Sequence, residues 1–221
     1  MEPSTRKVVQ RSPAHTVRLL HLPHLQPEAI EADSSVERDF VHCAALFPNV
    51  TSIKSQPFKL TLPSGKKYTP DYLVTFQDGS RAVVEVKPEK FVASFQAHFE
   101  QVRLKLSTSG IPFLLALDNV LRREGLAERA LYIRRYAKGA CDAEAMHKCK
   151  ALLEQVGDHG LPVKELTEAG ISQATMLYMV TRRQVLLSAD LHYEGNAKVR
   201  LFKQSVSGEN HAIRFANWLD A

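Results

Sequence analysis

Three residues combine acids with a lysine at a spacing that suits phosphodiester chemistry. Glu85 and Lys87 flank Val86, and Asp71 follows a proline. Side chains alternate between the faces of a β-strand, so Glu85 and Lys87 would share one face of a strand. Carboxylates hold hard divalent cations, while an ammonium group orients water and offsets charge on phosphorus. Simpler interpretations are a turn role for Asp71 and a solvated Glu85–Lys87 ion pair.

Asp71 joins this face only if the intervening hairpin has a suitable register. With Asp78-Gly79 as a two-residue loop, position 71 would pair with 86, and Asp71 would face away from Glu85. We therefore predict an odd-length loop or a β-bulge that brings Asp71 opposite Glu85 or Lys87.

Glu37 is a candidate third acid, on a helix predicted over residues 35–47. Ser34 and Glu37 have the spacing of a capping box, which alone would explain the glutamate. A third acid would instead help to hold or orient a cation. The apolar residues at helical spacing are Val36, Phe40, Ala44 and Phe47.

The elements that must position these residues form an α/β pattern. After the first helix we predict a three-strand meander over 52–62, 68–76 and 81–87. The apolar run 111–117 predicts a buried strand that returns to the sheet. An apolar stripe predicts a helix between them, at Phe91, Phe95, Phe99, Val102 and Leu106.

A second domain is predicted over residues 119–221, where helical segments replace apolar strands. Helices near 143–156, 162–169 and 172–182, followed by strands at 185–188 and 198–202 around Gly195-Asn196, suggest a mostly helical, winged-helix-like domain. A short helix containing Trp218 is expected to pack onto it. The pairs Arg122-Arg123, Arg134-Arg135 and Arg182-Arg183 are interpreted either as phosphate contacts or as solvated helix faces.

Composition favours a polyanionic partner and gives no membrane signal. The net charge is +5, and residues 1–32 read as an extended basic arm that either touches DNA or is a solvated leader, with Arg6, Lys7, Arg11 and Arg18. No apolar stretch has the length of a membrane span or of a signal peptide, so a cytoplasmic location is expected. Cys141, His147 and Cys149 lack the spacing of a structural zinc site.

The order of these motifs resembles a known nuclease fold. An acid on the first helix, Pro70-Asp71 and Glu85-Val86-Lys87 are similar to the PD-(D/E)xK restriction-endonuclease-like core, over residues 33–118. More narrowly, the chain resembles the TnsA transposon endonuclease. The segments that carry this resemblance are Ser35–Phe40, Gln56–Phe58, Tyr68–Val74 and Val84–Pro88.

This resemblance implies an active site of Glu37, Asp71, Glu85 and Lys87. The three acids and the Val86 carbonyl would bind Mg²⁺, with Mn²⁺ as a substitute, and Lys87 would position the attacking water. The implied activity is endonucleolytic hydrolysis of the non-transferred DNA strand near the 5′ transposon ends, during cut-and-paste transposition.

The resemblance also implies partners. A TnsB-type transposase would cut and join the 3′ ends, and the C-terminal domain would dock on a TnsC-type AAA+ ATPase, in the cytoplasm of a bacterium and at the nucleoid when active. The alternatives are a stand-alone restriction or repair nuclease and a non-catalytic winged-helix adaptor on a nuclease-fold scaffold.

Overall fold

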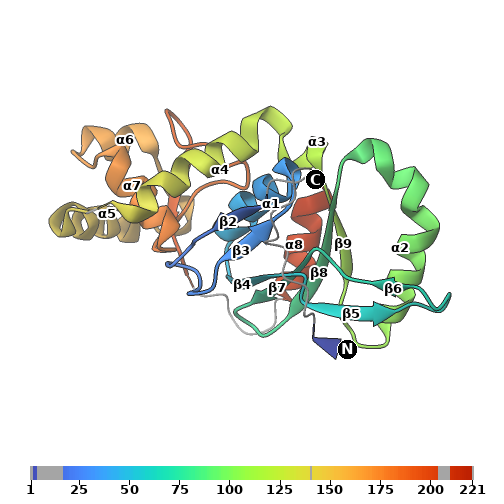
Figure 1. Cartoon of the computed structure of the whole chain (residues 1–221). Helices are drawn as coiled ribbons and strands as arrows, with labels where there is room; N and C mark the ends of the chain where they lie inside the picture. Colours follow the sequence, from blue (N-terminus) through green and yellow to red (C-terminus); the bar gives the residue numbers. More distant parts are fainter. Residues whose placement is uncertain (1, 4–16, 140, 204–209, 221) are drawn as a thin grey trace. The chain divides into compact units, whose positions relative to one another are not determined.

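The computed structural model describes residues 2–3, 17–139, 141–203 and 210–220 (Figure 1). The chain divides into two compact units. The first unit contains residues 1–123 and 208–221, and the second contains residues 124–207. The sequence predicted a single boundary at 118/119, whereas these units divide the chain after residue 123 and again after residue 207.

A four-stranded mixed sheet forms the centre of the first unit. Its spatial order is β4 (Val50–Ser55), β7 (Tyr72–Phe76), β8 (Arg81–Lys87) and β9 (Phe113–Leu117). The first three strands are antiparallel, and β9 runs parallel to β8. The order of the predicted meander and the returning strand are confirmed, although the first two strands are shorter than predicted.

Two of the predicted strands are each broken in the middle. Gln56 has a positive φ of 42° and precedes Pro57, so the chain turns out of the sheet after β4. Residues beyond the turn form a separate ribbon of β5 (Phe58–Thr61) and β6 (Lys67–Tyr68). The strand β1 (Glu2–Pro3) pairs with β5.

Helices cover both faces of the sheet. On one face, α2 (Val92–Ser107) and the ribbon enclose a core that includes Val83, Phe99 and Phe113. On the other face, Phe40 of α1 (Ser35–Leu46) packs against Tyr72, with ring centroids 5.2 Å apart. Short elements η1 (Glu89–Phe91), α3 (Asp118–Leu121) and η2 (Arg123–Gly125) complete the connections.

The terminal helix α8 (His211–Asp220) belongs to the first unit, and its predicted packing on the second domain is wrong. Asp78 Oδ2 accepts a hydrogen bond from the His211 backbone N–H at 2.9 Å. Phe215 packs against Phe76, and Trp218 against Phe47. Sequence periodicity predicted the helix, but not the hairpin turn that caps it.

Part of the predicted N-terminal arm is folded. Strands β2 (Arg18–Leu20) and β3 (Ile30–Ala32) form an antiparallel hairpin, and Leu22 and Ile30 are buried. The prediction of an extended arm is therefore wrong for this stretch, because its apolar residues complete the core. The basic residues Arg6, Lys7 and Arg11 lie outside the described residues.

The second unit combines helices with a small sheet. The predicted helices and the two strands after them are confirmed, whereas β10 was not predicted. The sheet order is β10-β12-β11. Its elements are α4 (Leu126–Arg135), η3 (Tyr136–Lys138), α5 (Ala143–Val156), η4 (Gly157–His159), β10 (Leu161–Pro162), α6 (Val163–Glu168), α7 (Gln173–Thr181), β11 (Val185–Leu186) and β12 (Lys198–Leu201).

Within the described segments, no helix has both the length and the apolar character that crossing a membrane requires.

Candidate active site

The β7–β8 hairpin brings Asp71 and Glu85 into register. Tyr72 pairs with Val84, and Thr75 pairs with Arg81. Asp71 precedes Tyr72 by one residue, so it lies opposite Glu85. The Phe76 N–H donates to the Ser80 carbonyl, which leaves residues 77–79 as the loop. The predicted odd-length loop is confirmed.

Asp71 is held rigidly beside β8. Its Oδ2 accepts a hydrogen bond from the Val86 N–H at 2.8 Å. Its backbone carbonyl accepts from the Gln56 N–H, also at 2.8 Å, at the point where the chain leaves β4. Both the side chain and the backbone of Asp71 are therefore attached to neighbouring strands.

Glu85 and Lys87 lie on the same face of β8, as predicted. The Lys87 Nζ is 2.9 Å from Glu85 Oε1. Glu85 is only 5% exposed, so the pair is not a solvated surface contact. The ammonium group also lies 5.4 Å from the ring centroid of Phe95 on α2. The simpler interpretation of a solvated ion pair is therefore wrong.

Tyr68 is a site residue that sequence reasoning missed. Its hydroxyl donates to Glu85 Oε2 at 2.5 Å. Burial, together with the charge of Glu85, raises the pKa of Tyr68 well above its usual value, so the phenol stays protonated and remains a donor. Its spacing to Asp71 gave no signal, because the contact depends on the ribbon that leaves the sheet.

Burial and like charge shift the titration of the site. Burial, followed by the charges of Glu85 and Glu37, raises the pKa of Asp71 to about 8, despite the Val86 N–H and Lys87. Burial lowers the pKa of Lys87, but the charges of Glu85, Asp71 and Glu37 outweigh it and raise the pKa overall. At neutral pH Lys87 is therefore charged, and Asp71 retains its proton in the metal-free site.

Glu37 forms the predicted cap at the start of α1. Its backbone N–H donates to Ser34 Oγ at 3.1 Å, and its Oε1 accepts from the same hydroxyl at 2.9 Å. Its Oε2 accepts from the Asp33 N–H at 2.9 Å, with the Tyr72 hydroxyl 3.4 Å away. The capping interpretation is confirmed, and the same carboxylate acts on the pKa values of Asp71 and Lys87 through its charge.

Comparison with known families identifies the segment that carries this geometry. Residues 47–118 match the family model described as "TnsA-like endonuclease N terminal". The predicted resemblance to TnsA is confirmed. The TnsA-like segment includes Asp71, Glu85 and Lys87, whereas Glu37 precedes it. No curated protein matches the chain.

The TnsA-like segment offers a cation two carboxylates. Among the residues that the structure describes, no group of three or more His, Cys, Asp or Glu side chains is arranged to hold a metal ion. The oxygens of Asp71 and Glu85 suit a hard cation. Burial, followed by the charges of Glu85 and Glu37, raises the pKa of Asp71 even with Lys87 nearby, and a divalent cation bound there would favour the ionised carboxylate. This pair therefore fits a cation, while Glu37 and the Val86 carbonyl as further ligands stay predictions.

Two of the basic pairs beyond the TnsA-like segment contain arginines with structural contacts. Arg122 Nε donates to Asp39 Oδ2 at 2.8 Å, which attaches the end of α3 to α1. Arg182 donates to the Ala137 carbonyl at 3.0 Å within the second unit. Burial lowers the pKa of Arg183 to about 10. These contacts explain Arg122 and Arg182 without a nucleic acid.

Proposed function

We propose that the chain is a metal-dependent DNA endonuclease and a subunit of a heteromeric transposase. The observation that carries this proposal is the meeting of Asp71, Glu85 and Lys87 on one sheet face within the TnsA-like segment. Two buried carboxylates beside a charged lysine suit phosphodiester hydrolysis. A scaffold without catalysis would have no need of such a costly buried cluster.

The residues have separable roles in the proposed reaction. Asp71 and Glu85 would hold Mg²⁺, or Mn²⁺ in its place, and Glu37 would add negative charge near them. When bound, the cation supplies Lewis-acid polarisation of the scissile phosphate. Lys87 orients the attacking water and offsets charge that develops on phosphorus. Tyr68 is a positioning residue that holds Glu85. The products carry 5′-phosphate and 3′-hydroxyl ends.

The proposed substrate is double-stranded DNA at the ends of a transposon. The chain cuts the non-transferred strand near each 5′ end, while a TnsB-type transposase cuts and joins the 3′ ends. The support for this division of labour is the similarity to TnsA. Both strands are then cut, and the element is excised.

We propose that the second unit is a winged helix that docks on a TnsC-type AAA+ ATPase. The element order β10-α6-α7-β11-β12, with α5 preceding it, supports a winged helix. In α7 most residues are buried, among them Met176, Leu177 and Met179. A helix that is buried to this extent is poorly suited to reading base edges, which counts against α7 as a DNA-recognition helix.

Mapping strand breaks tests the proposal. A donor plasmid with transposon ends is incubated with Mg²⁺, ATP, the partner transposase and ATPase, and either wild-type protein or Asp71→Ala. Loss of only the 5′-side cuts in the variant is the expected result. Identical breaks with both proteins would establish the adaptor alternative, and cleavage without partners or transposon ends would favour a stand-alone nuclease.

A further inference from the structure

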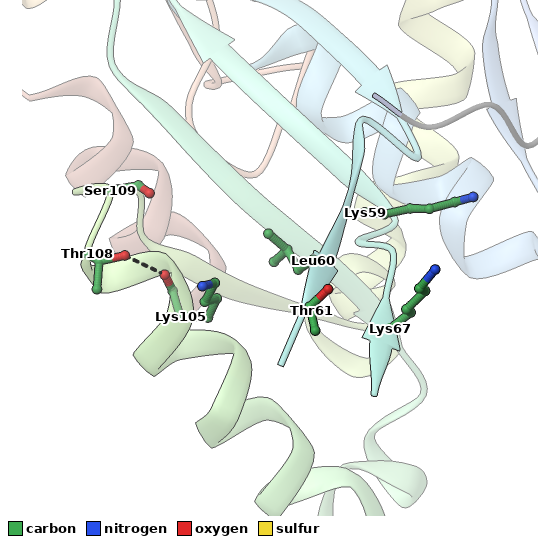
Figure 2. Close-up of a pocket in the computed structure, with 7 residues that line it drawn as sticks. All are labelled: Lys59, Leu60, Thr61, Lys67, Lys105, Thr108 and Ser109. Carbon is green, nitrogen blue, oxygen red and sulfur yellow. Dashed lines mark hydrogen bonds between the residues drawn. The ribbon is translucent and has the colours of Figure 1, made fainter. Parts of the chain in front are cut away.

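A basic cavity lies between the ribbon and the end of α2, outside the carboxylate site. Its volume is about 330 Å³. Figure 2 shows side chains from β5 and β6 on one wall, and from the last turn of α2 and the residues after it on the other. The lining residues are Lys59, Leu60, Thr61, Lys67, Lys105, Thr108 and Ser109.

The segments that line this cavity contain no acidic residue to balance its lysines. Residues 56–70 and 101–117 contain neither Asp nor Glu. Neither Lys67 nor Lys105 forms an ion pair with any side chain that the structure describes. Both lysines are exposed. The cavity therefore presents ammonium groups to solvent, with Leu60 as its one apolar lining residue.

A helix C-terminus disfavours an anion, but the last carbonyls of α2 are hydrogen-bonded within the chain. The Ser107 and Thr108 hydroxyls donate to the Leu104 and Lys105 carbonyls at 2.8 and 2.9 Å. The Ser109 and Gly110 N–H groups donate to the Leu106 and Ser107 carbonyls. The last carbonyls are thus satisfied internally, and Lys105, in the last turn of α2, is the positive charge that this helix brings to the cavity.

The ribbon links this cavity to the carboxylates. Lys67 and Tyr68 are consecutive in β6, so their side chains leave opposite faces of the ribbon. Tyr68 contacts Glu85, while Lys67 lines the cavity. Their Cα atoms are about 3.8 Å apart. The cavity and the carboxylates therefore flank the same short strand, so that one duplex laid across the ribbon would reach both.

We infer that this cavity binds the phosphate backbone of the DNA duplex beside the cleaved bond. Ammonium groups and hydroxyls recognise phosphate oxygens without reading sequence. Lys105 supplies charge from α2, and Lys59 and Lys67, whose side chains extend to the same side of the ribbon in Figure 2, supply it from the ribbon. The inference rests on the proposed nuclease function and adds to it the surface that holds the duplex.

The test measures binding rather than cleavage. Fluorescence anisotropy with a duplex of arbitrary sequence, in EDTA and over a range of salt, compares wild type with Lys67→Gln/Lys105→Gln. Each lost phosphate contact should reduce the slope of log K against log salt by about 0.9, so the double variant should lose close to 2. The control is Lys148→Gln/Lys164→Gln, which removes the same charge from exposed positions in the second unit.

Each outcome decides the inference. A weaker affinity and a shallower slope for the cavity variant alone would support it, with an unchanged thermal midpoint as the check on folding. If both double variants lost the same DNA affinity, the loss would follow from net charge alone, and the inference would be overturned. Unchanged DNA affinity, with saturable binding of inorganic phosphate to wild type alone, would assign the cavity to a free anion. Because no metal is present, the nuclease proposal is tested separately by strand mapping.

Discussion

Tyr68 and Glu85 are joined by a 2.5 Å hydrogen bond from the phenolic hydroxyl to Oε2. The two residues belong to different sheets, because Tyr68 lies on the ribbon and Glu85 on β8. With Lys87 on the other oxygen, both oxygens of Glu85 have a partner. The ribbon therefore helps to orient a carboxylate that the central sheet supplies.

Removal of this hydroxyl should impair catalysis more than folding. Tyr68→Phe keeps the ring in the core and is expected to reduce the cleavage rate about 10- to 100-fold, as losses of partners around metal ligands do. Duplex affinity in EDTA should not change. Single-turnover cleavage and anisotropy measure the two quantities, and a loss of affinity equal to the loss of rate would contradict a positioning role.

The two roles of Glu37 can be separated by a matched pair of variants. Glu37→Gln retains a capping side chain but removes the charge, and is expected to lower the cleavage rate about tenfold. Ser34→Ala removes the cap and keeps the charge, at a cost of about 1 kcal/mol in stability. Thermal melts and single-turnover rates distinguish them. Full cleavage activity in Glu37→Gln would show that Glu37 only caps the helix and that its charge has no role in cleavage.

The metal-free protein should become less stable as pH rises through the range set by Asp71. Its pKa is about 8 in the folded state against 3.8 as the ordinary value. Between these values the unfolded chain ionises the group while the folded chain keeps its proton, so stability is lost with rising pH. Asp71→Asn removes this loss. The difference in melting temperature in EDTA should grow by several degrees from about pH 5 to about pH 8, and a constant difference would contradict the raised pKa.

The turn that sets the site register should also stabilise α8. Asp78 Oδ2 and Ser80 Oγ accept from the first N–H groups of this helix, at 2.9 and 3.2 Å. Asp78→Ala should cost about 1 kcal/mol and lower the melting temperature of the first unit by roughly 2–4 °C. Differential scanning calorimetry measures this. An equal effect of Asp142→Ala, which removes the N-cap of α5 in the second unit, on the same transition would contradict the assignment.

The sequence was most informative where a local period determines the structure. Alternation along 81–87 placed Glu85 and Lys87 on one face, and helical spacing defined α1 and α2 closely. The odd number of residues in the β7–β8 loop was also predictable, because only such a loop lets Asp71 face Glu85 in this sequence.

What the sequence did not reveal depends on contacts between distant residues. The bend at Gln56 converts one predicted strand into two elements, and so brings Tyr68 over Glu85. The packing of α8 on the first unit depends on Asp78, more than a hundred residues earlier in the chain. Periodicity within a single segment carries no information on either pairing.

The return of α8 to the first unit has a consequence for biosynthesis. A ribosome makes residues 124–207 before it makes the helix whose Phe215 and Trp218 close one face of the sheet. The nascent chain therefore holds an unfinished nuclease core until translation has passed the second unit. If the chain cuts DNA as proposed, its nuclease core is therefore completed only after the part proposed to bind a partner protein has been made.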